Sequence, residues 1–114
     1  MKEVMAIIRS GKWIPTKIKL VELGITSYTT SRVYGRGRQK GLRYLSRQGG
    51  MTGMRTVPKR LVWLWLHDEQ VARAVEAIMN VNRTGAIGDG KIFVCPAEDA
   101  VRLRTGDRGE LAVF

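Results

Sequence analysis

An α+β fold is the class that this sequence predicts. Three observations lead to it: short apolar runs that alternate like β-strands, two stretches whose apolar residues recur at helical spacing, and the order of these runs along the chain. That order is strand, helix, strand, long loop, strand, helix, strand. With 114 residues and a hydrophobic content of 44%, the chain suits one compact domain over residues 1–114.

The first half of the chain predicts a strand, a helix and a second strand. Residues 2–9 alternate, with Val4, Ala6 and Ile8 on one face of a strand and Met5 and Ile7 on the other. A turn at residues 10–11 leads to a helix that ends at Gly24, and β-branched and aromatic residues then favour a strand over residues 25–34. The apolar stripe expected on this helix consists of Ile14, Ile18 and Val21, extended by Leu20 and Leu23.

The second half repeats this pattern. Residues 60–66 are apolar on both faces of a predicted strand, and Trp63 and Trp65 share one face, where we expect packing in the core or at a subunit interface. Asp68 and Glu69 mark the start of a helix, and residues 92–95 form a fourth short strand. The apolar positions of this helix are Val71, Ala74, Val75, Ile78 and Met79.

Between the second and third predicted strands lies a long segment, about residues 36–57, with little periodicity and many glycines. A connection of this length inside a small domain is commonly a functional loop. The whole order corresponds to a ferredoxin-like βαββαβ sandwich, in which helices cover one face of a four-stranded antiparallel sheet. Because the other face is apolar as well, we expect the domain to associate with copies of itself.

Charge and cysteine content narrow the class of protein. The net charge is +10, and no acidic residue occurs between Glu22 and Asp68, which suits phosphates, carboxylates, nucleic acid or an acidic protein surface as partners. A single cysteine, Cys95, excludes an internal disulfide and fits a reducing cytoplasm. No apolar run approaches the roughly 20 residues that span a bilayer. We therefore expect a cytoplasmic protein that does not insert into membranes.

Three separated segments combine glycine with fixed positive charge: residues 35–41, 84–91 and 102–106. Glycine lets backbone N–H groups approach an anion closely, and Arg or Lys neutralises its charge. Convergence of the three segments in the fold would create a polyphosphate site. Together they point to nucleotide sensing.

In this order and spacing, the segments resemble the PII signal-transduction family, and the resemblance runs from residues 1–9 to residues 102–106. It implies a trimer with ATP or ADP bound in the clefts between neighbouring subunits, and 2-oxoglutarate bound together with Mg-ATP. It also implies that the loop at about 36–57 contacts effectors and partners, and that a C-terminal segment at about 101–110 contacts nucleotide.

The resemblance assigns roles to individual residues. Gln39 would help to hold Mg²⁺ and the 2-oxoglutarate that it chelates, and Lys59 would pair with the distal carboxylate of 2-oxoglutarate. Mg²⁺ prefers the oxygen ligands that phosphate, ligand carboxylate and a side-chain carbonyl provide. The full set of binding residues that the resemblance implies is Thr29, Gly37, Arg38, Gln39, Lys40, Gly41, Lys59, Gly88, Asp89, Gly90, Lys91, Arg102 and Arg104.

The downstream half is most similar to the nitrogenase-associated NifI branch, in residues 53–60, 76–82 and 87–100. This implies a regulator of nitrogen fixation, working as a homotrimer or as a mixed oligomer with a paralogue, with dinitrogenase as its target. The loop is shorter than expected for that branch's second paralogue. Met51 stands where the enterobacterial pattern has a modifiable tyrosine, which rules out uridylylation at that position.

Three alternatives stay open at this point. One is a GlnK-like regulator of an ammonium transporter, with Arg47 at a plausible position for entering the transporter pore. Another is a basic ferredoxin-like module that binds nucleic acid, which is disfavoured because the predicted strands lack the aromatic motif of RNA-recognition modules. An enzyme is disfavoured because His67, the single histidine, has no catalytic pattern around it.

Overall fold

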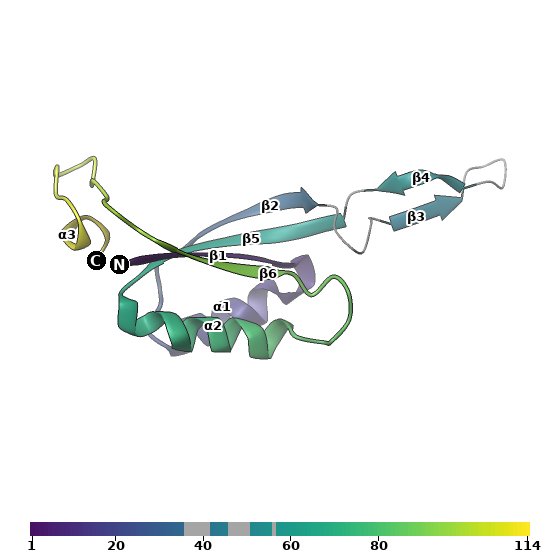
Figure 1. Ribbon diagram of the computed structural model, residues 1–114, viewed down its shortest axis with the longest axis horizontal. Helices are drawn as coiled ribbons and strands as arrows, with labels where there is room; N and C mark the ends of the chain where they lie inside the picture. Colours follow the sequence, from purple (N-terminus) through teal and green to yellow (C-terminus); the bar gives the residue numbers. More distant parts are fainter. Residues whose placement is uncertain (36–41, 46–50, 56) are drawn as a thin grey trace.

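A four-stranded antiparallel sheet with the strand order β2-β5-β1-β6 forms the centre of the molecule (Figure 1). The computed structural model describes residues 1–35, 42–45, 51–55 and 57–114, and side chains within 1–35 and 57–114. The four strands are β1 (Lys2–Arg9), β2 (Thr29–Gly35), β5 (Val57–Leu66) and β6 (Lys91–Pro96). The arrangement confirms the predicted ferredoxin-like α+β fold.

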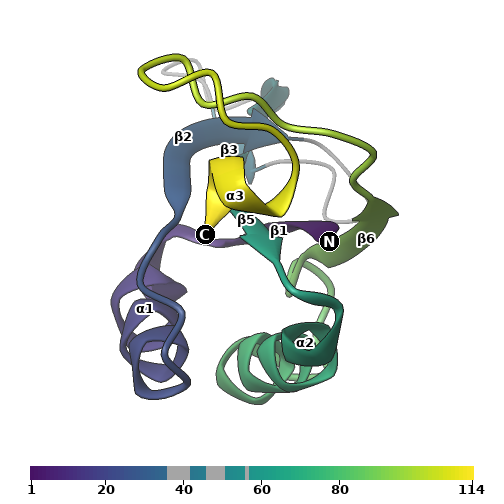
Figure 2. The same cartoon turned by 90° about the vertical axis from the view of Figure 1, so that its left-hand side faces the viewer.

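Two helices, α1 (Trp13–Glu22) and α2 (Asp68–Asn82), lie side by side on one face of the sheet (Figure 2). A short 3₁₀ turn, η1 (Ser10–Lys12), connects β1 to α1. Alternate residues in the middle of β1 and β5 face the helices and are apolar, and they form the core together with residues of both helices. Its buried members are Val4, Ala6, Ile8, Trp13, Leu20, Ile25, Val62, Leu64, Leu66, Ala74 and Ile78.

A buried polar contact joins the two helices. Asn82, the last residue of α2, donates from Nδ2 to the Thr16 hydroxyl of α1 at 3.0 Å and to the Ile78 carbonyl at 2.8 Å. The Thr16 hydroxyl in turn donates to the Lys12 carbonyl. Buried polar groups that are bonded in this way fix one relative position of their elements. The contact thus fixes the point at which the chain leaves α2 for the glycine-rich loop.

The predicted apolar stripe of the first helix was wrong in part. Ile14, Ile18 and Val21 are exposed, whereas Trp13, Thr16 and Leu20 face the sheet. Helical periodicity alone cannot choose between two apolar faces, and this helix has one on each side. The aromatic Trp13 decides the matter, because it buries more area and packs edge-on against Tyr28 with ring centroids 5.1 Å apart.

The second strand begins at Thr29 instead of residue 25. Ile25 belongs to the end of α1: its N–H donates to the Leu20 carbonyl, and Gly24, at φ +81°, donates to Val21. These two bonds form a Schellman motif, whose usual companion is an apolar contact between the residues at its two ends. Ile25 and Leu20 are both buried in the core. A helix stop therefore explains the apolar character that resembled a strand.

The sheet face that lies away from the helices carries apolar side chains. Met5 of β1 lies opposite Trp63 of β5 and Phe93 of β6, and Trp63 and Trp65 share this face as predicted, with ring centroids 6.1 Å apart. Phe93 is 45% exposed, and Met5, Ile7, Leu61, Trp63 and Trp65 are half-buried. We call this surface the open face.

The long loop contains regular structure of its own. β3 (Leu42–Leu45) and β4 (Met51–Arg55) pair antiparallel as a separate two-stranded ladder, beyond the ends of β2 and β5 in Figure 1. A last short helix, α3 (Glu110–Val113), lies at the opposite end of the molecule, near both termini. Among the helices that the structure describes, none is both long and apolar enough to span a membrane.

Candidate functional site

A cross-strand pair of cations holds the glycine-rich loop between α2 and β6. Arg9 at the end of β1 lies opposite Lys59 near the start of β5. Lys59 donates from Nζ to the Gly88 carbonyl at 2.6 Å, and Arg9 donates from Nη2 to the Ile87 carbonyl and to Asp89 Oδ1, each at 3.2 Å. Two predicted site segments, Lys59 and residues 88–91, are therefore in direct contact.

Asp89 is the internal anchor of this loop. Its Oδ2 accepts the backbone N–H groups of Thr84 and Gly85 at 2.8 and 2.9 Å, and its Oδ1 accepts the Thr84 hydroxyl. These donors stabilise the charged carboxylate and hold the pKa of Asp89 well below its usual range, with the Thr84 hydroxyl as the largest cause. Since both carboxylate oxygens are engaged inside the loop, the side chain shapes the loop.

Gly88 and Gly90 have φ values of +104° and +106°, a region that favours glycine. At Gly90 an added Cβ would lie 1.8 Å from the Ile7 carbonyl oxygen. The loop can therefore pass over β1 only with glycine at position 90. This close passage brings Lys91, the first residue of β6, beside Ile7 in the sheet.

The Lys59 amine is a buried cation whose environment disfavours its charge. Burial is the main cause that lowers the pKa of Lys59, and the nearby Arg9 guanidinium lowers it further, while the Asp89 carboxylate opposes both effects. An anion that arrived between Arg9 and Lys59 would relieve this repulsion. The cluster thus has the electrostatics of an anion site.

The second predicted half of the site lies in the segment after β6. Arg102 sits in a closed turn: its N–H donates to the Asp107 carbonyl at 2.9 Å, its carbonyl accepts from Gly106 at 2.7 Å, and a bridge joins Val101 to Arg108. Arg104 is exposed in the same turn. Gly106, at φ +76°, permits the reversal of the chain.

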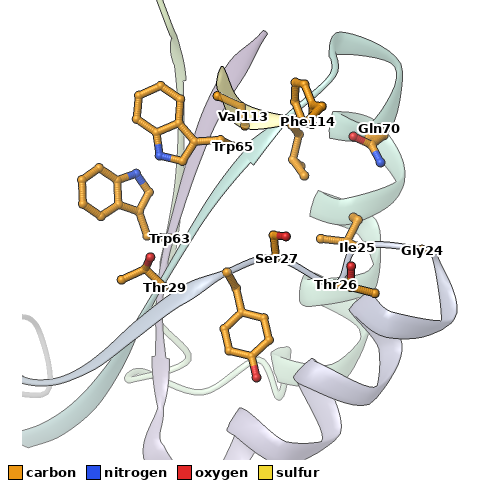
Figure 3. A pocket seen from close by; sticks show the side chains of 12 residues that line it. Gly24, Ile25, Thr26, Ser27, Thr29, Trp63, Trp65, Gln70, Val113 and Phe114 are labelled. Atoms are coloured by element: carbon orange, nitrogen blue, oxygen red, sulfur yellow. The ribbon is translucent and has the colours of Figure 1, made fainter. Parts of the chain in front are cut away.

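Thr29 lies at this second end as well, in a hollow of about 350 Å³ (Figure 3). Trp63 and Trp65 form one side of the hollow, and Val113 and Phe114 form another. Thr26, Ser27 and Gln70 add polar groups. The hollow combines flat apolar walls with a few hydrogen-bonding groups, as small-molecule pockets do.

The predicted site residues therefore form two groups within one chain. Lys59 and the run Gly88, Asp89, Gly90 and Lys91 lie at one end of the sheet, and Thr29, Arg102 and Arg104 lie towards the other. The six residues of β6, about 20 Å of extended chain, run from the first group towards the second. Gly37, Arg38, Gln39, Lys40 and Gly41 lie outside the described residues, so the predicted Mg²⁺ contact of Gln39 stays a prediction.

The individual site residues predicted from the sequence include neither Arg9 nor Thr84, although Thr84 begins the predicted segment 84–91. Both had a signal: Arg9 is a cation that ends an apolar strand, and Thr84 precedes Asp89 by five residues in a glycine-rich turn. Neither signal is decisive without the strand register that brings Arg9 opposite Lys59. Within the residues that the structure describes, His, Cys, Asp and Glu side chains form no group of three that could hold a metal ion.

A model of the family described as nitrogen regulatory protein P-II matches residues 1–107. The chain belongs to the P-II family. This family consists of regulatory signal-transduction proteins, and the ferredoxin-like fold described above is consistent with it. The earlier resemblance is therefore confirmed.

The relatives that align over the full length include nifHD-region proteins and proteins named only as nitrogen regulatory protein P-II. A "nitrogen fixation nifHD region GlnB-like protein 2" of Methanobacterium ivanovii is 49% identical over all of both chains, and its namesake in Methanococcus maripaludis is 46% identical over 99% of this chain and 100% of the relative. A "nitrogen regulatory protein P-II" of Azospirillum brasilense is 43% identical, over 99% of this chain and 100% of the relative. The protein is thus a P-II family nitrogen regulatory protein close to nitrogen-fixation-associated members.

The alignments also show how the length of this chain compares with the lengths of its relatives. The alignment with the Methanobacterium relative runs over 124 positions, whereas the chain has 114 residues, so at least ten of those positions have no residue here. The alignment with the Azospirillum relative runs over 113 positions. This chain is therefore more similar in sequence to the Methanobacterium relative, whereas its length is nearer to that of the Azospirillum relative.

Proposed function

We propose that this P-II family protein senses adenine nucleotides and 2-oxoglutarate at sites formed between neighbouring copies of the chain. The separation of the two basic groups carries the proposal. Lys59 and residues 88–91 supply cations and glycine at one end of the sheet, and Arg102 and Arg104 supply cations towards the other. One copy offers two half-sites, and a second copy would supply the missing half of each.

The open face provides a surface on which copies would associate. Its half-buried apolar residues come from β1, β5 and β6, and burying them against another copy would remove apolar area from water at roughly 25 cal/mol per Å². Trimeric assembly, as the family resemblance implies, would cover this face and bring Arg102 of one copy towards Lys91 of the next.

Within such a site the roles follow the chemistry of the donors. Arg102, Arg104, Lys91 and Arg38 would neutralise the phosphates of ATP or ADP, and Thr29 would lie near the base in the hollow beside Trp63. Lys59 would exchange its contact with the Gly88 carbonyl for a carboxylate of 2-oxoglutarate. Mg²⁺ would supply the link between nucleotide phosphates and 2-oxoglutarate, with Gln39 as a protein ligand.

The output of this sensor would be the conformation of the loop at about residues 36–57, which contains Gln39 near its start and ends close to Lys59 in the sequence. We propose nitrogenase as the target, because the nifHD-region names of the relatives place them with nitrogen fixation. The shorter length keeps a GlnK-like role at an ammonium transporter as the alternative. A cytoplasmic homotrimer or a mixed oligomer with a paralogue fits either target.

Calorimetric titration of 2-oxoglutarate, with and without Mg-ATP, tests the proposal on protein whose oligomeric mass has been measured. Binding in the presence of Mg-ATP alone supports it. Absence of 2-oxoglutarate binding under both conditions contradicts the carbon-sensing part and leaves an adenine-nucleotide sensor to be tested by titration of ATP and ADP.

One pair of variants separates the two ligands. We expect Lys59→Ala to weaken the binding of 2-oxoglutarate far more than the binding of ATP, because Lys59 lies on the carboxylate side of the proposed site. Lys91→Ala should weaken ATP binding directly, and it should weaken 2-oxoglutarate binding only as a consequence of the lost nucleotide. Equal losses of both ligands in Lys59→Ala would show that Lys59 acts mainly by holding the Gly88 carbonyl.

A further inference from the structure

The segment that follows the Arg102 turn folds back and docks on the start of α2. The Phe114 ring stacks on the His67 imidazole, with ring centroids 3.6 Å apart and planes 22° apart. Glu110 of α3 lies 3.7 Å from His67 Nδ1. An exposed polar contact at this distance adds little stability, so the ring stack is the stronger attachment.

The docked segment reaches the side chain of Arg102. Arg102 donates from Nε to the carbonyl of Ala112, at 3.3 Å, and Ala112 lies two residues before Phe114. The helical turn of α3 connects the two points, since Phe114 donates its N–H to the Glu110 carbonyl and Ala112 donates to Gly109. The stack on His67 therefore fixes the carbonyl that holds the guanidinium.

Backbone bonds alone do not orient this guanidinium. The Arg102 backbone is closed into its turn by Asp107 and Gly106, and Asp99 ties Arg108 and Gly109 to the base of the same segment. These contacts would remain if residues 110–114 were displaced. The bond from Nε to Ala112 is a separate constraint that acts on the side chain.

An arginine held through Nε still presents both Nη groups in one plane. Those groups form the fork that binds two oxygens of a phosphate, and an arginine held in advance loses less side-chain entropy when it binds. Among the residues that the structure describes, the carboxylate paired with this fork is Asp107, whose Oδ2 lies 4.0 Å from Nη1, beyond hydrogen-bonding distance. The segment thus leaves the phosphate-binding edge of Arg102 available.

We propose that residues 110–114 act as a positioning element that holds the Arg102 guanidinium ready for phosphate, with Phe114 on His67 as its anchor. The proposal rests on the proposed nucleotide site and names Phe114 and His67 as positioning residues that act through Ala112. The same segment also contributes to the second feature of this end of the molecule, because Val113 and Phe114 line the hollow beside Thr29 (Figure 3).

The test is a thermodynamic cycle on ATP binding with Phe114→Ala, Arg102→Ala and the double variant. Because the freed Arg102 side chain would lose more conformational entropy on binding, we expect Phe114→Ala to weaken ATP binding by about three- to tenfold. If Phe114 acts through Arg102, the same change has no further effect in the Arg102→Ala background. If Phe114 instead contacts the base as a wall of the hollow, its effect persists there, and the proposal is overturned.

Three further variants control the interpretation. Leu111→Ala changes a residue of α3 that is 73% exposed and should leave ATP affinity unchanged. Phe114→Tyr and His67→Phe keep a ring stack and should retain wild-type affinity. Losses as large in Leu111→Ala as in Phe114→Ala would show that any disturbance of α3 has the same effect and would also overturn the proposal.

A measurement without nucleotide separates this inference from the proposed function. The Nε–H NMR signal of Arg102, identified by its loss in Arg102→Lys, should exchange with solvent faster in Phe114→Ala than in wild type or Leu111→Ala. Unchanged exchange would refute the positioning role even if ATP binds. Failure of wild-type protein to bind ATP would refute the nucleotide site, while faster exchange would still support the hold of the segment on Arg102.

Discussion

Asp89 shows how one side chain both stabilises the fold and shapes a binding loop. Its carboxylate accepts hydrogen bonds from Thr84, Gly85 and Arg9, which lower its pKa in the folded protein. An unfolded aspartate has a pKa of about 3.9. A depressed pKa in the folded state therefore contributes stability that is fully present above about pH 5 and is lost progressively as the pH falls towards the folded pKa.

The lowered pKa of Asp89 predicts an acid-sensitive loop. We expect the melting temperature of wild-type protein to fall between about pH 5 and pH 3, and Asp89→Asn to be less stable at pH 7 but to lose less on acidification. Thermal unfolding from pH 3 to pH 7 measures both effects. Glu76→Gln, a change at an exposed position of α2, is the control and should follow wild type. A curve for Asp89→Asn parallel to wild type would contradict the assignment.

A substitution of Gly90 should destabilise the folded protein, because the loop needs glycine at this position. In Gly90→Ala the new methyl group would collide with the Ile7 carbonyl at a φ of +106°, so the loop must move off β1. The strain alone costs about 1–3 kcal/mol of unfolding free energy, and the collision adds to it. Gly85→Ala is the matched control, because its φ is +85° but no atom lies within 4 Å of the added Cβ. Urea unfolding of both variants checks this, and equal losses would show that backbone strain alone matters.

At the scale of elements, α1 shows that apolar residues at helical spacing are not all buried. Leu20 is fully buried, whereas Ile18 is 52% exposed on the other side of the same helix. We expect Leu20→Ala to lower the free energy of unfolding by about 2–5 kcal/mol. Ile18→Ala should change it by less than about 1 kcal/mol. Chemical denaturation measures the difference, and a large loss in Ile18→Ala would show that the outer face of α1 is covered in the assembled protein.

The elements also show what the sequence could and could not predict. The span of β1 and the shared face of Trp63 and Trp65 follow from strict alternation, and these predictions were confirmed. Ile25 was misassigned because a Schellman motif needs an apolar residue after its glycine, just as a strand does. The role of Arg9 depends on a contact across 80 residues, and local patterns contain no such information. The Thr84 contact spans five residues and lies within a segment that the sequence had already marked.

At the scale of the whole molecule, the candidate site residues form two separate groups because they lie near opposite ends of the sheet. Lys91 begins β6, and Arg102 follows the end of that strand, so the length of the strand keeps the two residues apart within one copy. The sequence showed the net charge and the three basic segments, but the division depends on the sheet register. The same register gathers the apolar residues of the open face.

The open face predicts how to disrupt the assembly without unfolding the subunit. Phe93→Glu places a charge among Met5, Trp63 and their neighbours, where it would be buried without a partner in an oligomer. Phe93 is 45% exposed in the single chain, so the subunit itself should tolerate the change. We expect sedimentation analysis to give the mass of a trimer for wild type and a lower mass for Phe93→Glu, at similar helix content by circular dichroism.

Ile18→Glu provides the matched control, because it introduces the same charge at a similarly exposed position, 52%, on the helical side of the subunit. It should keep the mass of wild type. If Phe93→Glu keeps the oligomer and Ile18→Glu dissociates it, the subunits associate through their helices. The two halves of the proposed nucleotide site would then have to meet in another way, because the open face would be free of partners.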